Sequence, residues 1–496
     1  MSNSIWRRKP ISAFEADMKK SELKRVLTKW GLTSLGIGAV IGGGIFTLTG
    51  IAAHDFAGPA LALSFVIAGI GCMFASLCYA EFASVLPVEG SAYAYAYGTI
   101  GEFFAWFIGW NLILEYMMGA TTVAVAWSGY FGKLLHLFHI NLPIWLMNDP
   151  TTAAIKAKEL GEAAPAFAFN LPAFLITWLV TAILVKGIKE AASTNNVIVI
   201  VKIAVVLFVI VVGAFYVDTA NWHPFIPETV IDPVTLKESF GWDGVVTAAT
   251  IVFFAYIGFD AVSTQAGEAI NPKKDVPFAI ITSLIVCTIL YILVSLVLTG
   301  MVHYSKLDIT APVASAFEGV GLTWAVFLIV IAATAGLFSV MLVMMLAQTR
   351  IFLGMAKDGL LPKKLFGDLH PTFKTPYKST ILVGLIISIV AAVTPINKIA
   401  EMCSMGTLLA FAMVCGAVWL LRIKEPNLDR PYRTPLLPLV ATLGMGFNVF
   451  LMTKVRPETW TAFLIWGGLG IIIYFLYSYK RSNLHNVDET KSNGQL

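Results

Sequence analysis

Two long apolar stretches of the sequence contain residues that interrupt helices. The first contains Gly42–Gly44, and the second contains Ala255-Tyr-Ile-Gly-Phe-Asp260. Each glycine inside a helix costs roughly 1 kcal/mol relative to alanine, and unpaired backbone groups in lipid cost still more. A membrane helix keeps such a break only where its backbone lines a cavity or holds a ligand. The two breaks therefore predict a binding site within a membrane, as is typical of transporters.

The composition places most of the chain in lipid. The residues are 57% hydrophobic and only 13% charged, whereas a soluble domain needs about 25% charged residues. The five cysteines lie in apolar runs without metal-ligand spacing, so we expect buried thiols and no metal site. No Ser–His pair or phosphate loop is evident, and we expect no enzyme activity, no cofactor and no nucleic-acid partner.

Twelve apolar stretches approach the length of about 20 residues that one membrane crossing requires. Their ranges are 32–52, 59–86, 100–131, 171–185, 195–217, 243–267, 276–301, 322–355, 379–393, 402–421, 435–451 and 459–479. With the N-terminus inside, 25 of the 34 lysines and arginines fall in cytosolic segments and eight fall outside. This excess predicts a multi-pass protein of the cell membrane with both termini in the cytosol.

The breaks fall in the first and sixth predicted spans, which suggests two halves of five helices each. An odd number of helices per half makes the halves run in opposite directions, as in an inverted repeat. We therefore predict an all-α integral membrane protein with twelve transmembrane helices. Its parts are an N-terminal tail (1–31), two repeats (32–217 and 218–421), two accessory helices (422–480) and a C-terminal tail (481–496).

Backbone chemistry at the breaks suggests the kind of ligand. A half-helix that begins near Gly43 and Gly44 offers amide N–H groups and a partial positive charge to a carboxylate. Carbonyl groups before the breaks suit an ammonium group. Together they predict an α-amino acid site made of Val40, Gly42, Gly43, Gly44, Phe254, Ala255 and Ile257. The alternative is close helix packing through small residues, which Gly38 and Gly42 also fit.

Six motifs stand out, at residues 36–46, 79–84, 253–260, 268–277, 358–362 and 430–435. They resemble those of the amino acid–polyamine–organocation transporters, and the similarity covers about residues 25 to 480. It is closest to bacterial members of the cationic amino acid transporter branch. The resemblance implies a 5+5 inverted repeat of the LeuT-like kind, with substrate near the middle of the membrane.

The resemblance also implies roles for single residues. Phe254 would be a lid over the bound amino acid. Independently of the resemblance, Met344 in the apolar run 340–346 is a candidate to line the pocket for the side chain of the amino acid; the alternative is that it faces lipid or core. Lys202 would take the place of the metal ion that supports the first break in sodium-coupled proteins of this fold. Many relatives have Ser, Thr or Ala where Gly43 stands. The missing side chain is expected to leave the backbone amides available but to loosen the loop, which leaves affinity and substrate size open.

Three ionisable residues lie away from the ends of predicted spans, where charges are costly and usually functional. Lys202 is about 10 Å into its helix. Burial at this depth would let it gain and lose a proton near neutral pH; the alternative is that its side chain snorkels to the cytosolic interface. Glu115 could stabilise Lys202, relay protons, face the substrate or be a protonated structural residue. Asp260 follows the second break and could cap its second half or carry protons.

These features predict a proton-coupled importer of neutral, small to medium amino acids, with protons and the lipid bilayer as its other partners. The alternative is a proton-independent exchanger or uniporter of cationic amino acids or polyamines. A sensor built on a transporter scaffold is a third hypothesis, against which the short predicted C-terminal tail argues. The sequence does not indicate an accessory subunit.

Overall fold

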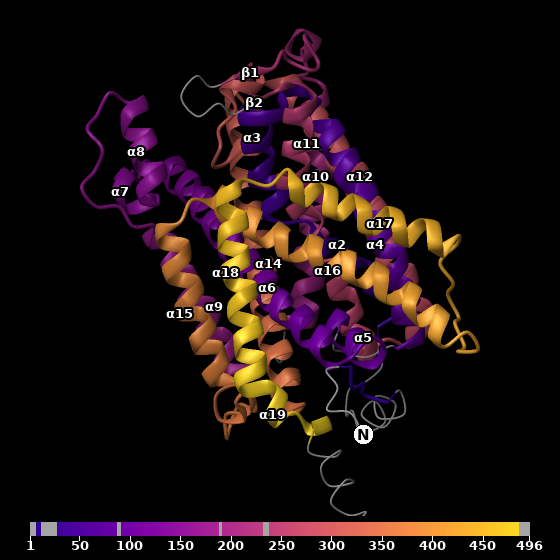
Figure 1. Ribbon diagram of the computed structural model, residues 1–496. Coiled ribbons are helices and arrows are strands. Elements are labelled where there is room, and N and C mark those ends of the chain that lie inside the picture. The colour runs from indigo at the N-terminus through magenta and orange to yellow at the C-terminus, as the bar shows by residue number, and fades with distance from the viewer. Residues whose placement is uncertain (1–5, 11–26, 87–90, 188–190, 232–237, 486–496) are drawn as a thin grey trace, which may run out of the picture.

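The computed structural model describes all residues except 1–5, 11–26, 87–90, 188–190, 232–237 and 486–496 (Figure 1). Most of the two predicted tails, residues 1–31 and 481–496, therefore lie outside the described residues. The described part is a bundle of helices, and each of the twelve predicted ranges is helical over most of its length. The all-α prediction is confirmed; the only described strands are two short ones in a loop.

Helices follow one another from the first break to the middle of the chain. They are α2 (Lys29–Val40), η1 (Gly44–Leu48), α3 (Thr49–Ala52), η2 (Ala53–Ala57), η3 (Gly58–Ala60), α4 (Leu61–Val85), α5 (Ser91–Thr99), α6 (Glu102–Leu137), α7 (Ile144–Met147), α8 (Pro150–Glu159), α9 (Leu171–Lys186), α10 (Ala191–Ala214) and η4 (Thr219–Trp222). Two strands of two residues each, β1 (Val230–Ile231) and β2 (Glu238–Ser239), then pair in antiparallel orientation.

The second part of the chain is again helical. It contains α11 (Gly241–Val252), η5 (Phe253–Tyr256), η6 (Asp260–Glu268), α12 (Pro272–Met301), η7 (Tyr304–Lys306), α13 (Pro312–Gly319), α14 (Thr323–Lys357), η8 (Lys363–Gly367), α15 (Tyr377–Val393), α16 (Ile396–Lys424), α17 (Leu437–Thr453), α18 (Pro457–Ile473), η9 (Tyr474–Ser478) and α19 (Tyr479–Arg481).

The surface of the bundle is apolar where a soluble protein would be polar. Within the described residues, six helical segments are long and apolar enough to cross a membrane, and the first of them runs over 57 residues from Lys29 to Val85. Four shorter apolar helices accompany them. Large side chains such as Phe215 (83% exposed) and Leu476 (75% exposed) cover the outside. Lipid is the solvent that such a surface requires.

A buried carboxylate joins α4 to the segment after α16. Glu81 accepts hydrogen bonds from Arg422 Nη2 (2.5 Å), Arg422 Nε (3.2 Å) and the Thr434 amide (2.8 Å), and Arg430 Nε lies 3.5 Å away. The carboxylate is almost fully buried. A charge in such a place is stable only with partners of this kind, so the cluster fixes one end of α4 to the chain that follows α16.

We predict that Glu81→Ala lowers thermal stability markedly. Removing one partner of a buried ion pair costs about 3 kcal/mol because the other charge loses its compensation. Thermal unfolding in detergent, followed by size-exclusion chromatography, measures the change. Glu162→Ala, which removes an exposed loop carboxylate, is the control and should leave the melting temperature unchanged. Equal melting temperatures for both variants would contradict the prediction.

Candidate functional site

The first predicted break is present. Helix α2 ends at Val40, and Ile41 is extended (φ −71°, ψ 101°). Helical structure resumes at Gly44, with Gly43 as the residue before it. The amides in the first turn of a helix have no partner within that helix, so Gly43 and Gly44 stand where the sequence predicts an anion-binding helix start.

The second predicted break is also present. Helix α11 changes at Phe253 into the 3₁₀ segment η5, Ile257 is extended (φ −62°, ψ 131°), and η6 begins at Asp260. Gly258 has φ +121°, a conformation that side chains rarely permit. A Cβ atom at Gly258 would lie 2.9 Å from the carbonyl oxygen of Ala39. Glycine is thus required here by both conformation and contact.

The two breaks touch each other through their backbones. A Cβ atom at Gly44 would lie 2.3 Å from Ala255 Cα, so Gly44 is needed for close packing. Gly42 is less confined, with Val340 Cγ1 at 3.3 Å from the position of a Cβ atom, and Gly43 has room, with Ala126 Cβ at 3.5 Å. The neighbouring glycines therefore differ. Close packing requires glycine at Gly44, whereas the space around Gly43 would admit a larger residue.

Lys202 lies on α10 and is completely buried. Its ammonium group donates hydrogen bonds to the carbonyl oxygens of Gly38 and Ile41, the latter at 3.1 Å. The position beside carbonyl groups of the first break agrees with what the family resemblance implies. Gly336 of α14 makes room for this side chain, because a Cβ atom there would lie 2.7 Å from Lys202 Cδ.

Tyr291 of α12 joins the two breaks, and the sequence alone did not identify it. Its hydroxyl lies 2.8 Å from the carbonyl oxygen of Val40 and 3.0 Å from that of Ala255. These are two of the carbonyl groups predicted to hold an ammonium group, and the structure brings them to within hydrogen-bond distance of one donor. A single tyrosine in an apolar span gives no signal in one sequence, because aromatic residues are common in membrane helices.

We predict that Tyr291→Phe slows transport about tenfold. The variant keeps the ring but removes the one hydroxyl proton that these two buried carbonyl groups share, and an unpaired buried group costs about 1–3 kcal/mol. Initial uptake rates in proteoliposomes measure the effect. Tyr93→Phe is the control, because its hydroxyl is also buried but donates to Asp358 Oδ2 (2.8 Å) and the residue lies outside both breaks. A wild-type rate for Tyr291→Phe would contradict the prediction.

A second pair of contacts ties α6 to the broken segments. Tyr116 OH donates to Asp260 Oδ2 (3.1 Å), and Asp260 Oδ1 accepts the Gly258 amide (3.3 Å). Asp260 thus binds the amide of Gly258, which precedes η6; a capping role for the second half stays a prediction. Tyr130 OH donates to the carbonyl oxygen of Phe46 (2.6 Å) at the other end of the first break. Neither tyrosine was identified from the sequence.

Glu115 lies on α6 and is completely buried, but it does not pair with Lys202 among the described residues. Within the described residues, neither carboxylate oxygen of Glu115 has a hydrogen-bond partner, and the nearby Thr407 hydroxyl donates to Cys403 O instead. No described ion pair joins Glu115 to Lys202, whose ammonium is bound to the first break. A carboxylate in this position is stable only when protonated or bound to a ligand or water.

Phe254 and Met344 lie in the core of the bundle. Phe254 belongs to η5 at the second break and is 3% exposed. The sulfur of Met344 lies 2.9 Å from the place of a Cβ atom at Gly119 of α6, so Met344 packs between α14 and α6. Both residues are therefore internal, and Met344 does not face lipid.

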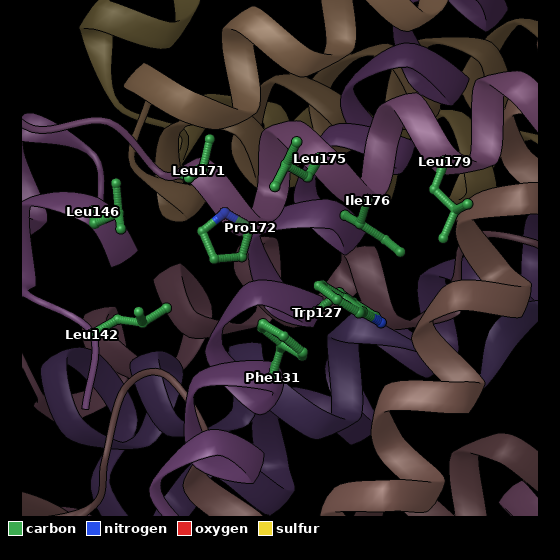
Figure 2. A pocket seen from close by; sticks show the side chains of 9 residues that line it. All are labelled: Trp127, Phe131, Leu142, Leu146, Leu171, Pro172, Leu175, Ile176 and Leu179. Carbon is green, nitrogen blue, oxygen red and sulfur yellow. The ribbon is translucent and has the colours of Figure 1, made fainter. Parts of the chain in front are cut away.

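A separate groove lies between α6, α7 and α9 (Figure 2). It has a volume of about 400 Å³, and its lining is apolar: Trp127, Phe131, Leu142, Leu146, Leu171, Pro172, Leu175, Ile176 and Leu179. A charged ligand needs polar partners to orient it. We therefore do not assign this groove as the amino acid site.

The chain is similar to known transporters over nearly its whole length. The family model described as amino acid permease matches residues 27–477. The methylthioribose transporter of Bacillus subtilis (strain 168) is 44% identical over 97% of this chain and 100% of its own. The branched-chain amino acid permease BcaP of the same organism is 44% identical over 98% and 100%. The vacuolar cationic amino acid transporter 2 of Arabidopsis thaliana is 37% identical over 86% of this chain and 64% of its own.

Proposed function

The chain belongs to the amino acid permease family, and on this premise we propose that it imports amino acids across the cell membrane by alternating access. Family membership makes it a multi-pass membrane transporter and not an enzyme. The observation that carries the proposal is the contact between two broken helices, Gly44 against Ala255. Such contacts between interrupted helices are where transporters hold their substrates.

In the proposed site, the carboxylate of the amino acid binds the amides at Gly43 and Gly44. Its ammonium group binds carbonyl groups of Val40, Phe254, Ala255 and Ile257. The charges complement each other, because the start of a helix is partially positive and freed carbonyl oxygens are acceptors. Since Tyr291 is bound to two of these carbonyl groups in this structure, the substrate has to share or replace that contact.

We also propose the architecture predicted from the sequence. Twelve spans form two inverted repeats, residues 32–217 and 218–421, followed by accessory helices in 422–480. Both termini are cytosolic. The distribution of lysine and arginine supports this orientation, and the position of the breaks at the start of each half supports the repeat.

We assign proton coupling to Lys202, with Glu115 and Asp260 as further proton carriers. Support comes from their complete burial and from the contact of Lys202 with the first break. A proton gained or lost by Lys202 would change the bonds that hold Gly38 and Ile41. Proton movement would therefore change the shape of the substrate site.

The proposed substrates are neutral amino acids of small to medium size. The name of the branched-chain amino acid permease, at 44% identity over its full length, favours this class. The equally similar methylthioribose transporter makes methylthioribose a second candidate substrate. The cationic amino acid transporters at lower identity keep a cationic substrate or a proton-independent exchanger as the alternative.

Uptake into proteoliposomes tests these proposals. We expect labelled leucine, valine or alanine to accumulate when the outside is acidic, and unlabelled amino acids to compete. Arginine, putrescine and methylthioribose are the competing substrates for the alternatives. Accumulation that is indifferent to the proton gradient, but occurs by counterflow, would favour the exchanger. Uptake of methylthioribose without uptake of any amino acid would overturn the assignment of an amino acid substrate.

A further inference from the structure

The start of α2 and the start of α12 share a basic and aromatic surface that the proposed transport chemistry does not use. We call it the α2–α12 patch and define it as Lys29, Trp30, Lys273, Lys274 and Phe278. The three lysines are exposed, as are Trp30 (62%) and Phe278 (36%). An exposed tryptophan beside lysines is typical of the boundary between a membrane and water.

Contacts within the patch join the two helices. Lys29 Nζ lies 5.7 Å from the centre of the Trp30 ring and 5.2 Å from the centre of the Phe278 ring. The two rings meet edge to face at 5.3 Å. Because Lys29 belongs to α2 and Phe278 to α12, the patch spans the junction between the ends of these helices.

The positive charge of the patch is poorly compensated within the protein. Lys273 lies 4.0 Å from Asp429, whose side chain is 84% exposed, so this pair is weak. Asp275 accepts a hydrogen bond from the Asn271 amide (3.3 Å). No described carboxylate forms an ion pair with Lys29 or Lys274. The three lysines and the two aromatic side chains are thus exposed at the starts of the same two helices.

We propose that the α2–α12 patch binds the headgroup of an anionic phospholipid from the cytosolic leaflet. The lipid phosphate lies among the ammonium groups of Lys29, Lys273 and Lys274, and the start of its acyl chains lies beside Trp30 and Phe278. The complementary charge of the cytosolic leaflet carries the assignment, since each lysine near such a surface strengthens binding about fivefold. The proposal rests on the proposed orientation, which places this end of the molecule in the cytosol.

The bound lipid has a consequence for the transport site. Tyr291 of α12 binds Val40 at the far end of α2, and the lipid joins the near ends of the same two helices. Lipid binding thus holds α2 against α12 at both ends. The start of α2 already contacts α12 through Trp30 and Phe278, and release of the lipid weakens this junction. The same helix carries the carbonyl groups bound to Lys202.

Lipid retention by the purified full-length protein tests the proposal. The protein is equilibrated with phosphatidylglycerol or phosphatidylcholine in detergent, and bound lipids are counted by native mass spectrometry. The patch variant carries Lys29→Gln, Lys273→Gln and Lys274→Gln. The control variant carries Lys363→Gln, Lys364→Gln and Lys378→Gln, which removes the same charge from another cytosolic segment of the proposed topology.

We expect the patch variant to bind phosphatidylglycerol at least tenfold more weakly than wild type. The control variant should bind it like wild type, and 0.5 M salt should weaken the wild-type binding. Equal phosphatidylglycerol retention by the patch variant and wild type would overturn the proposal, as would an equal loss in both variants. Should the triple variant aggregate, Lys274→Gln alone should bind about fivefold more weakly.

The same proteins distinguish this proposal from the proposed function. In vesicles of phosphatidylcholine with one quarter phosphatidylglycerol, wild-type uptake should exceed that in pure phosphatidylcholine severalfold. The patch variant should lose this stimulation. Selective binding of phosphatidylglycerol without any amino acid uptake would support the lipid proposal and overturn the assignment of an amino acid substrate. Amino acid uptake without selective lipid binding would support the substrate assignment and overturn the lipid proposal.

Discussion

Lys202→Met should reduce uptake roughly twentyfold or more. The methionine side chain fills similar space but has no donor for the carbonyl oxygens of Gly38 and Ile41. Each buried carbonyl group without a partner costs about 1–3 kcal/mol, and both belong to the first break. The break therefore loses the geometry that the proposed site requires. Initial rates of amino acid uptake in proteoliposomes measure the loss.

Two further variants test whether transport depends on the position of the Lys202 ammonium group or on the loss of any lysine. Gly336→Val keeps Lys202 but fills the space of its side chain, and we expect a similar loss of uptake. Lys398→Met removes an exposed lysine and should transport like wild type. Normal uptake by Lys202→Met, with a normal elution profile, would remove Lys202 from the mechanism. Loss of gradient-driven uptake with retained counterflow would assign it to proton coupling alone.

The neighbouring glycines of the first break should respond very differently to alanine. Gly44→Ala places a methyl group 2.3 Å from the backbone of Ala255, where neither helix can yield without moving the other. Such overpacking costs about 1–3 kcal/mol or more, and we expect at least a tenfold loss of uptake. Gly43→Ala meets Ala126 at an ordinary 3.5 Å and should retain uptake within about threefold of wild type.

This pair contains its own control, because both substitutions add one methyl group to adjacent residues. Substrate affinity and maximal rate, measured for both variants in the same vesicles, show which step is affected. Equal loss in both variants would mean that backbone flexibility limits transport, and that close packing is not the reason for glycine at position 44. Equal tolerance would contradict the contact with Ala255.

The breaks could be predicted because their signal is local. Three consecutive glycines and Ile257-Gly258-Phe259 destabilise the helices of apolar stretches, which lipid tolerates only where the freed backbone groups are bound. Lys202 is conspicuous in the same way, as a charge within an apolar span. The structure places Lys202 at the first break and the two breaks in contact. Composition likewise sufficed to predict an all-helical membrane protein.

The partners of the breaks could not be predicted because they come from distant helices. Tyr116, Tyr130 and Tyr291 bind the broken segments through single hydroxyl groups, and no local pattern separates them from the other tyrosines. The suggested pairing of Glu115 with Lys202 failed to appear among the described residues for the same reason: depth in a span does not tell which way a side chain points.

The contact of Gly44 with Ala255 has a mechanical consequence. Gly44 has no side chain, and Ala255 contributes only its backbone and its methyl group to the contact. A displacement of either segment is therefore transmitted directly to the other, because neither residue has a side chain that can rotate away. In the proposed site, the carboxylate of the amino acid binds the first broken segment and its ammonium group binds carbonyl groups of the second. One bound amino acid can therefore move both segments together. Compounds that have only the carboxylate or only the ammonium group would bind one segment without moving the other, and would act as inhibitors of transport.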